Sequence, residues 1–314
     1  MTTHPRFPPC TDNPSTVLIL GARGRLGLAA ARAFAQAGWQ VLAQVRPGAR
    51  GPALPAIAGV WWMPVAVEDT AALAAQAQGA QVVVHALNPA YTHKAWREEA
   101  PALMEAAIAI TRQLRATLML PGNVYNFGQS MPAVLLEGAP ERPSMAMGRI
   151  RAAMEARLEA ATQRGELRAV VVRAGNFYGQ GSGTWLDRAM LTGIHRGKLV
   201  FPGPMDVATP WAYLPDLART FVALAQVRHS MPAFESLHFS GHTLTGADWV
   251  HALEPLARKQ GWLKADQPLR VGGLPWPLIH ALGTVMPGWG ALSALRYLWT
   301  QPHQLDNRRL RSLI

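Results

Sequence analysis

The chain has 314 residues, of which 49% are hydrophobic and 16% charged, the balance of a globular protein long enough to bury a substantial core. A net charge of +11 raises nucleic acid as a partner, but the arginines are spread along the chain, so we expect no nucleic-acid binding. Cys10 is the single cysteine, which excludes an internal disulfide and a cysteine-rich metal site. We expect no metal and a cytoplasmic location, because thiols stay reduced there.

Neither end of the chain indicates export or a membrane. Residues 1–14 contain four prolines and no apolar run, so we expect a loose extension and not a signal peptide. The most apolar late stretch, residues 273–292, is interrupted by three prolines and by His280. A membrane-spanning helix would tolerate these poorly, so we expect no membrane partner.

The first half of the chain alternates short apolar strands with helical patterns. Strands are predicted over residues 17–20, 40–45, 60–65, 81–87, 116–120 and 168–173. After the first strand, Leu26, Ala30 and Ala33 recur at helical spacing, and Gly38 ends that helix. Strands that alternate with helices pair in parallel through right-handed crossovers, so the fold class is α/β with a Rossmann-type doubly wound sheet.

The pattern becomes irregular after the last of these strands. Glycine and proline clusters follow at residues 179–183 and 202–204. We expect a dinucleotide-binding domain over residues 15–175 plus about 212–240, and a smaller substrate-binding lobe from residues 176–211 and 241–314. Ligands of open α/β sheets bind at the carboxyl ends of the strands, where such a lobe would lie.

A glycine-rich turn follows the first strand directly. Gly21 and Gly24 allow the backbone to turn tightly and approach a pyrophosphate, and Gly27 allows the helix to pack closely on the strand. The helix N-terminus supplies amide donors and a positive dipole. The expected phosphate-binding residues are Gly21, Arg23, Gly24, Arg25, Leu26 and Gly27.

The residue after the second strand indicates the cofactor. An NAD site places Asp or Glu there, about twenty residues beyond the glycines, to bind the ribose hydroxyls. This chain has Arg46 instead, which suits the 2′-phosphate of NADP, and Arg23 and Arg50 could complete a clamp. Because the sequence places no acid near Arg46, we expect NADP(H) to be preferred over NAD(H).

Four ordered segments follow the glycine turn. They are V-V-V-H-A at residues 82–86, G-N-V-Y at 122–125, R-A-G-N-F-Y-G at 173–179 and Y-L-P-D-L-A at 213–218. In this order the chain resembles the extended short-chain dehydrogenase/reductases, the NAD-dependent epimerase/dehydratase group, over roughly residues 16–240. The resemblance implies an NAD(P)-binding oxidoreductase or epimerase-like enzyme.

The same resemblance locates the catalytic residues of that family, and here they are replaced. In the family a Ser or Thr polarises the substrate oxygen, a Tyr transfers the proton, and a Lys four residues later lowers the Tyr pKa. These positions correspond to Pro121, Met147 and Arg151. Ala66 replaces an acid that often contacts adenine. The resemblance therefore implies an atypical member without the Tyr-x-x-x-Lys dyad.

Substitutes for the missing groups lie near the expected nicotinamide. Tyr125 is the first candidate acid, although the corresponding tyrosine is often packed structure, and Arg151 could still hold the nicotinamide ribose. His85 could titrate, but at the end of a buried strand it is more often a core residue.

The remaining expected contacts follow from the ends of the strands and the aromatic residues of the lobe. Further cofactor contacts are expected at Leu87, Asn88, Pro121, Gly122, Arg151 and Asn176. Substrate contacts are expected at Tyr91, Asn123, Tyr178, Trp185, Trp211 and Tyr213. Packing alone would explain the aromatic residues of the lobe equally well.

Two functions remain open. The first is an NADP-dependent oxidoreductase or epimerase-like enzyme acting on a small carbonyl or sugar-like substrate, which the roomy lobe favours. The second is a non-catalytic NADP(H)-sensing module, similar in logic to the nitrogen-metabolite-repression regulators, which the lost catalytic positions favour. The family resemblance also implies that a homodimer could form through helices near residues 94–115 and 144–164.

Overall fold

A computed structural model describes residues 14–48, 53–181, 183–283 and 285–314. The expected N-terminal extension up to residue 13, and Arg50 of the expected phosphate clamp, lie outside the described residues.

Parallel strands form the central sheet. They are β1 (Thr16–Leu20), β2 (Gln40–Val45), β3 (Val60–Pro64), β4 (Ala80–His85), β5 (Thr117–Gly122), β7 (Arg168–Arg173) and β11 (Phe234–His238). Their order is β11-β7-β5-β4-β1-β2-β3, so the chain winds outward in both directions from β1. This confirms the doubly wound α/β fold. The seventh strand, β11, was not predicted, because this edge strand is only partly buried and lacks an apolar run.

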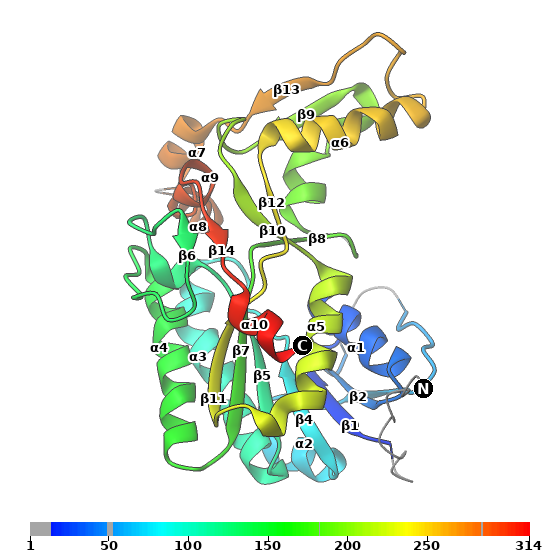
Figure 1. Cartoon of the computed structure of the whole chain (residues 1–314), viewed down its shortest axis with the longest axis vertical. Helices are drawn as coiled ribbons and strands as arrows, with labels where there is room; N and C mark the ends of the chain where they lie inside the picture. The colour runs from blue at the N-terminus through cyan, green and yellow to red at the C-terminus, as the bar shows by residue number, and fades with distance from the viewer. Residues whose placement is uncertain (1–13, 49–52, 182, 284) are drawn as a thin grey trace, which may run out of the picture.

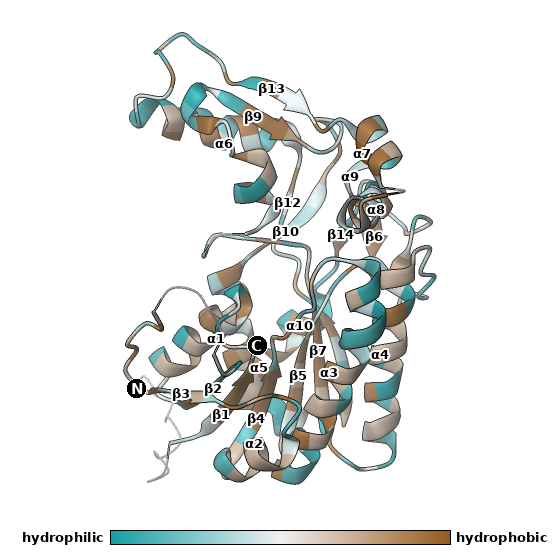
Figure 2. Ribbon diagram, turned by 180° about the vertical axis from the view of Figure 1, so that it is seen from behind, coloured by the Kyte–Doolittle hydropathy of each residue, from teal (hydrophilic) through white to brown (hydrophobic). Residues whose placement is uncertain are grey.

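Helices cover both faces of the sheet (Figure 1). One face carries α1 (Arg25–Gln36) and α5 (Leu214–Val227), and the other carries α2 (Thr70–Gln76), α3 (His93–Leu114) and α4 (Ala146–Gln163). Side chains of β1 alternate between these layers: Val17 and Ile19 pack with α1 and α5, whereas Leu18 and Leu20 pack with α2, α3 and α4. Figure 2 shows the hydrophobic strands between helices whose outer faces are more hydrophilic.

Helices α3 and α4 pack side by side inside the domain. Met147, Met154 and Leu158 of α4 are buried in the same core cluster as Ala107 and Ile110 of α3. These buried side chains of α3 and α4 therefore belong to the core of a single chain. A homodimer through α3 and α4 stays a prediction, and it would have to use their outer faces.

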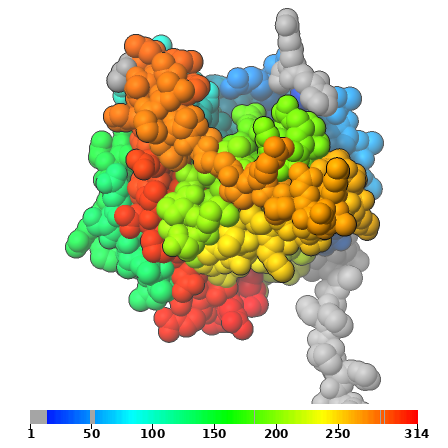
Figure 3. Space-filling view, turned by 90° about the horizontal axis from the view of Figure 1, so that it is seen from above, coloured from blue at the N-terminus to red at the C-terminus, as the bar shows by residue number. Residues whose placement is uncertain are grey.

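The lobe lies beyond the carboxyl ends of the strands. It contains a three-stranded sheet of β8 (Asn176–Tyr178), β10 (Thr209–Tyr213) and β12 (His242–Leu244), and the strand pair β9 (Lys198–Phe201) and β13 (Arg270–Gly273). Its helices are η2 (Leu186–Met190), η3 (Ile194–Arg196), α6 (Gly246–Lys259), α7 (Trp276–Leu282), α8 (Pro287–Ala294) and α9 (Tyr297–Thr300). Seen from above, the lobe forms most of this end of the molecule (Figure 3). Among the described residues, no helix is both long and apolar enough to cross a membrane.

The end of the chain leaves the lobe. The pair β6 (Val134–Leu135) and β14 (Gln304–Leu305) leads to α10 (Arg308–Leu313), which packs beside β11 (Figure 1). Leu310 is buried in the same core cluster as β1, and Arg309 forms an ion pair with Glu235 of β11 at 3.0 Å. The expectation that the lobe extends to residue 314 is therefore corrected, because the last helix completes the nucleotide domain.

Candidate functional site

The glycine turn has the geometry that a dinucleotide requires. Gly21 has a φ of +75°, and its carbonyl oxygen accepts a hydrogen bond from the Gly24 amide at 2.9 Å. A Cβ at Gly27 would lie 2.4 Å from that same oxygen, so the helix and the turn approach each other too closely for any side chain. Leu26 is buried beneath the turn.

The N-terminus of α1 is open to an anion. Its first residue after the Gly24 cap is Arg25, and the helix has no side-chain cap and no acidic residue in its first turn. The first-turn amides of a helix and the helix dipole favour a pyrophosphate at such a position. The residues of the turn therefore fit a dinucleotide, as the sequence indicates.

Gln44 is a functional residue that the sequence analysis missed. Its side-chain oxygen accepts the Gly21 amide at 2.9 Å, and its amide group donates to the Val65 carbonyl at 2.7 Å. A polar residue inside a predicted strand was the available signal, because a buried amide group must find hydrogen-bonding partners. Gln44 thus fixes the turn to β2 and to the end of β3.

The two arginines of the turn differ in their surroundings. Arg23 is half-buried within it, whereas Arg25 reaches toward the lobe, where a Cβ at Gly183 would lie 2.6 Å from its Nη1 atom. Burial lowers the pKa of Arg25, and nearby Asp187 of the lobe raises it. The Arg25 side chain therefore links the nucleotide domain to the lobe, while its position at the helix start suits the pyrophosphate.

Arg46 lines a large cavity at the ends of β2 and β3. This cavity has a volume of about 640 Å³, and Val67 forms part of its apolar floor. Glu68, Glu98 and Glu99 line the same cavity. Glu98 and Glu99 belong to α3, more than fifty residues from Arg46 in the sequence, so the sequence did not indicate that they line the same cavity. The cavity offers both a cation for a 2′-phosphate and carboxylates for ribose hydroxyls.

The ends of β4 and β5 carry the residues that the sequence analysis expects beside the nicotinamide. Leu87 lies against the glycine turn, since a Cβ at Gly21 would be 2.9 Å from its Cδ2 atom. Asn88 follows on the exposed loop, and its side chain donates to the Pro89 carbonyl. Pro121 and Gly122 end β5, where Gly122 pairs with β7.

Tyr125 lies in an aromatic cluster beside Arg151. Its hydroxyl forms a short hydrogen bond with the hydroxyl of Tyr91. The ring of Trp96 lies 5.8 Å from that of Tyr91 and 6.3 Å from that of Tyr125. The guanidinium carbon of Arg151 lies 5.6 Å from the centre of the Trp96 ring. The structure thus brings the two tyrosines and the cation together from three elements.

Burial and the charge of Arg151 have opposite effects on the pKa values of Tyr125 and Tyr91. Burial raises the pKa of Tyr125 well above its usual value, and Tyr91 adds to the rise, whereas the charge of Arg151 acts against it. Tyr91 is 43% exposed as a whole residue, but desolvation of its hydroxyl raises its pKa, while the hydrogen bond with Tyr125 and then the charge of Arg151 act in the opposite direction. Both phenols are therefore protonated at neutral pH, and Arg151 is placed to stabilise a phenolate.

Two of the three positions that the family resemblance assigns to catalysis hold apolar residues here. Met147 is 1% exposed and belongs to the core of the nucleotide domain, and Pro121 is half-buried at the end of β5. Neither can transfer a proton. Arg151 remains from that set of three positions, and it is buried.

A buried ionic network supports the turn that carries Tyr125, and the sequence analysis missed it. Arg173 of β7 donates to Glu155 at 2.8 Å, to Glu141 at 3.0 Å and to the Asn123 carbonyl at 2.6 Å. The Asn123 side chain accepts the Tyr125 amide at 3.0 Å. Asn123, expected to contact substrate, therefore uses its polar groups to shape this turn.

The aromatic residues expected to contact substrate belong largely to the lobe's own packing. Trp211 has no exposed surface and lies 4.8 Å from Trp249, ring to ring, so it is a core residue and not a pocket wall. Asn176 pairs with Trp211 between β8 and β10, and Tyr178 pairs with Tyr213 two positions further along the same strands. The half-buried members of this group are Asn176, Tyr178, Trp185 and Tyr213.

Tyr297 of α9 is a further member of the site that the sequence did not indicate. Its ring is 5% exposed, and burial, followed by the neighbouring Tyr91, raises its pKa. A segment near the C-terminus thus reaches the Tyr91–Tyr125 pair. No local motif marks such a residue, because its position depends on how the lobe folds back.

Comparisons with known proteins agree with this architecture. Residues 17–237 match the model of the NAD dependent epimerase/dehydratase family. The UDP-glucose 4-epimerase from Brucella ovis in complex with NAD is 16% identical, with 86% of this chain and 92% of that chain covered and a TM-score of 0.65. A human epimerase family protein with NADPH is 21% identical, with 95% and 93% covered and a TM-score of 0.65. The UDP-Glc/GlcNAc 4-epimerase from Campylobacter jejuni is 15% identical, with 95% and 92% covered and a TM-score of 0.69. No curated protein matches the chain in sequence.

Proposed function

Because the chain belongs to the NAD-dependent epimerase/dehydratase family, we propose that it is an NADP(H)-dependent oxidoreductase acting on the carbonyl group of a small or sugar-like substrate, with Tyr125 as the proton donor. The observation that carries the proposal is the hydrogen-bonded pair of Tyr91 and Tyr125 beside Arg151. The fitting glycine turn supports a dinucleotide, and solved structures of similar fold hold NAD or NADPH. The single cysteine favours a cytoplasmic location.

The chemistry divides between the cofactor and the chain. A bound nicotinamide would supply the hydride to the carbonyl carbon, and the chain must supply a proton to the carbonyl oxygen. Tyr125 can do so because burial keeps its phenol protonated at neutral pH. After the proton leaves, the Tyr91 hydroxyl can donate to the Tyr125 oxygen, and the charge of Arg151 stabilises it.

Stopped-flow loss of nicotinamide absorbance across a panel of carbonyl substrates tests the proposal. Tyr125→Phe should slow hydride transfer by about a hundredfold or more and leave the NADPH affinity unchanged. Tyr91→Phe is the matched control, since it breaks the same hydrogen bond but keeps the donor, and it should slow the step by about tenfold or less. Turnover that survives Tyr125→Phe, or equal losses in both variants, would remove Tyr125 as the acid.

The second candidate function is NADP(H) sensing without catalysis. The observation that favours it is the apolar character of Met147 and Pro121 at the family's proton-transfer positions. Ordinary epimerase or dehydratase turnover on nucleotide sugars should therefore be undetectable. Intact NADPH binding with no turnover on any carbonyl of the panel would favour the sensor over the reductase.

A further inference from the structure

Arg151 is a buried cation whose donor groups are not used by the protein. The residue is 8% exposed, and within the part of the chain that the structure describes it takes part in no hydrogen bond and no ion pair. The buried atoms without a partner include its Nε but neither Nη atom, so both Nη atoms have surface that a ligand can reach. A guanidinium group that lacks an acceptor is costly to bury, so a ligand that supplies one is bound favourably.

The nearest acid does not supply that acceptor. Burial lowers the pKa of Arg151, and Glu155 is the largest of the causes that raise it. Both carboxylate oxygens of Glu155, however, accept from Arg173, at 2.8 and 3.4 Å. Glu155 therefore compensates part of the charge from a distance, and the Nη groups of Arg151 stay available to a ligand.

Arg151 lies beside the group that we propose as the proton donor. Its guanidinium carbon is 5.6 Å from the centre of the Trp96 ring, and the Tyr125 ring is 6.3 Å from the same ring. The charge of Arg151 also acts on the phenols of Tyr91 and Tyr125. The proposed sites for the cofactor phosphates are the glycine turn and the ends of β2 and β3. An anion at Arg151 would therefore come from the substrate.

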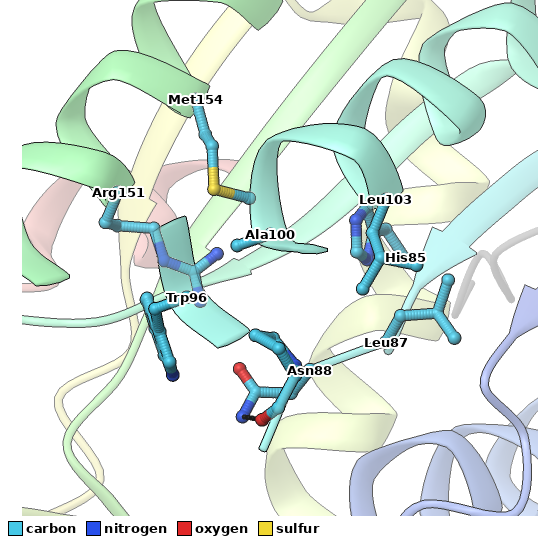
Figure 4. A pocket seen from close by; sticks show the side chains of 9 residues that line it. His85, Leu87, Asn88, Trp96, Ala100, Leu103, Arg151 and Met154 are labelled. Carbon is cyan, nitrogen blue, oxygen red and sulfur yellow. Dashed lines mark hydrogen bonds between the residues drawn. The ribbon is translucent and has the colours of Figure 1, made fainter. Parts of the chain in front are cut away.

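The space beside Arg151 limits which anion fits. Figure 4 shows the guanidinium group next to a small cavity that Asn88 also lines, and the cavity volume is about 10 Å³. This is room for about one water-sized group, such as a single oxygen. A phosphoryl group carries three such oxygens, whereas a carboxylate carries two in one plane and matches the parallel N–H donors of a guanidinium group. Asn88 is exposed, so the remainder of a ligand can extend on that side.

We propose that Arg151 binds the carboxylate group of the substrate, and that the substrate is a 2-oxo acid or a similar compound with a carboxylate next to its reacting carbonyl group. The carbonyl carbon would take the hydride and the carbonyl oxygen the proton of Tyr125, so the product is a 2-hydroxy acid. This product rests on the proposed function, whereas the binding of the carboxylate requires no turnover.

Calorimetric titration of the NADPH complex tests the carboxylate site without turnover. Oxamate, a 2-oxo acid analogue that nicotinamide does not reduce, should bind at least about tenfold tighter than its neutral methyl ester. Arg151→Met should abolish this difference, and Arg151→Lys, which keeps the charge without the parallel donors, should retain only part of it. Arg149→Met, at an exposed residue of the same helix, is the matched control and should retain all of it.

Two results of these titrations would overturn the proposal. The first is equal binding of oxamate and its methyl ester to the unaltered protein. The second is an Arg151→Met variant that keeps the preference for oxamate but loses affinity for NADPH, because Arg151 would then hold the neutral nicotinamide ribose instead.

Kinetics separates this inference from the proposed function. Pyruvate or phenylpyruvate should be reduced with a kcat/KM at least about a hundredfold above that of its methyl ester, and Arg151→Met should remove this advantage mainly through KM. Oxamate binding that depends on Arg151, without turnover of any carbonyl compound, would refute the reductase and retain the carboxylate site. Turnover that does not favour the acids over their esters would refute the carboxylate site and retain the reductase.

Discussion

At the scale of single residues, we expect the choice of cofactor to depend on the charge of Arg46 and on the glutamates that line the same cavity. We predict that NADPH binds at least about tenfold tighter than NADH, which corresponds to about 1.4 kcal/mol. Arg46→Ala should abolish this preference, and Glu98→Gln should increase it, because it removes a negative charge from the same cavity. Calorimetric titration with both dinucleotides measures the two effects, and Arg149→Ala, on the exposed surface of α4, is the control. Equal affinities in the unaltered protein would show that the 2′-phosphate is not bound here.

Two of the buried histidines, His85 and His238, give the stability a pH dependence that can be predicted. Burial lowers the pKa of His85 and of His238 to about 4, with Arg151 and Arg173 respectively as the second cause. The unfolded chain protonates these rings near pH 6.5, so below that pH it binds more protons than the folded chain. Each histidine should therefore remove about 1.4 kcal/mol of stability per pH unit as pH falls from 6.5 toward 4, and none above 6.5.

Urea unfolding at a series of pH values between 7.5 and 4 measures this dependence. His85→Phe should make the free energy of unfolding depend less steeply on pH in that window, because one titrating group is gone. An identical slope in the variant would mean that His85 is protonated in the folded protein.

At the scale of elements, the close contact between the glycine turn and α1 sets the dinucleotide site. Gly27→Ala places a Cβ 2.4 Å from the Gly21 oxygen, so the turn must open. We expect at least about a tenfold loss of NADPH affinity, measured by fluorescence titration. Gly272→Ala, where a Cβ meets no atom within 4 Å, should leave the affinity unchanged. Full affinity in Gly27→Ala would mean that this contact does not shape the site.

The Arg173 network holds β7, α4 and the turn after β5 together. Arg173→Met leaves the Glu155 carboxylate buried without its cation, so the free energy of unfolding should fall by about 3–5 kcal/mol. Arg157→Met breaks an exposed ion pair between α4 and Glu105 of α3 and should cost about 1 kcal/mol or less. Urea unfolding of both variants provides the comparison. Similar small losses would show that the buried pair is dispensable.

At the scale of the whole molecule, helix α10 at the end of the chain packs against the nucleotide domain. Leu310 is 4% exposed in the core shared with β1, so Leu310→Ala should destabilise the protein by about 2–4 kcal/mol. Leu278→Ala, at a residue 52% exposed in the lobe, should change the stability by less than about 0.5 kcal/mol. Thermal and urea unfolding distinguish the two. A neutral Leu310→Ala would mean that α10 is not part of the folding unit.

The sequence by itself determined most of the sheet and the glycine turn that follows its first strand. Six of the strands were predicted because buried parallel strands are continuous apolar runs, and the glycine turn was predicted because its backbone requirements are local. The absence of the Tyr-x-x-x-Lys dyad was also predicted from the sequence, because a missing lysine can be recognised without knowing the structure. Trp211 was predicted to contact substrate because the lobe is rich in aromatic residues, but its side chain is wholly buried.

Only the tertiary structure decided how the site is composed. The acids around Arg46 come from α3, the partner of Tyr125 is Tyr91 from the loop before α3, and Tyr297 reaches them from near the C-terminus. Each pairing depends on which strand ends and helices pack against each other. No periodic pattern along the chain indicates which of them do. The burial of the His85 ring has the same origin, because it is a property of the surrounding packing and not of the V-V-V-H-A segment.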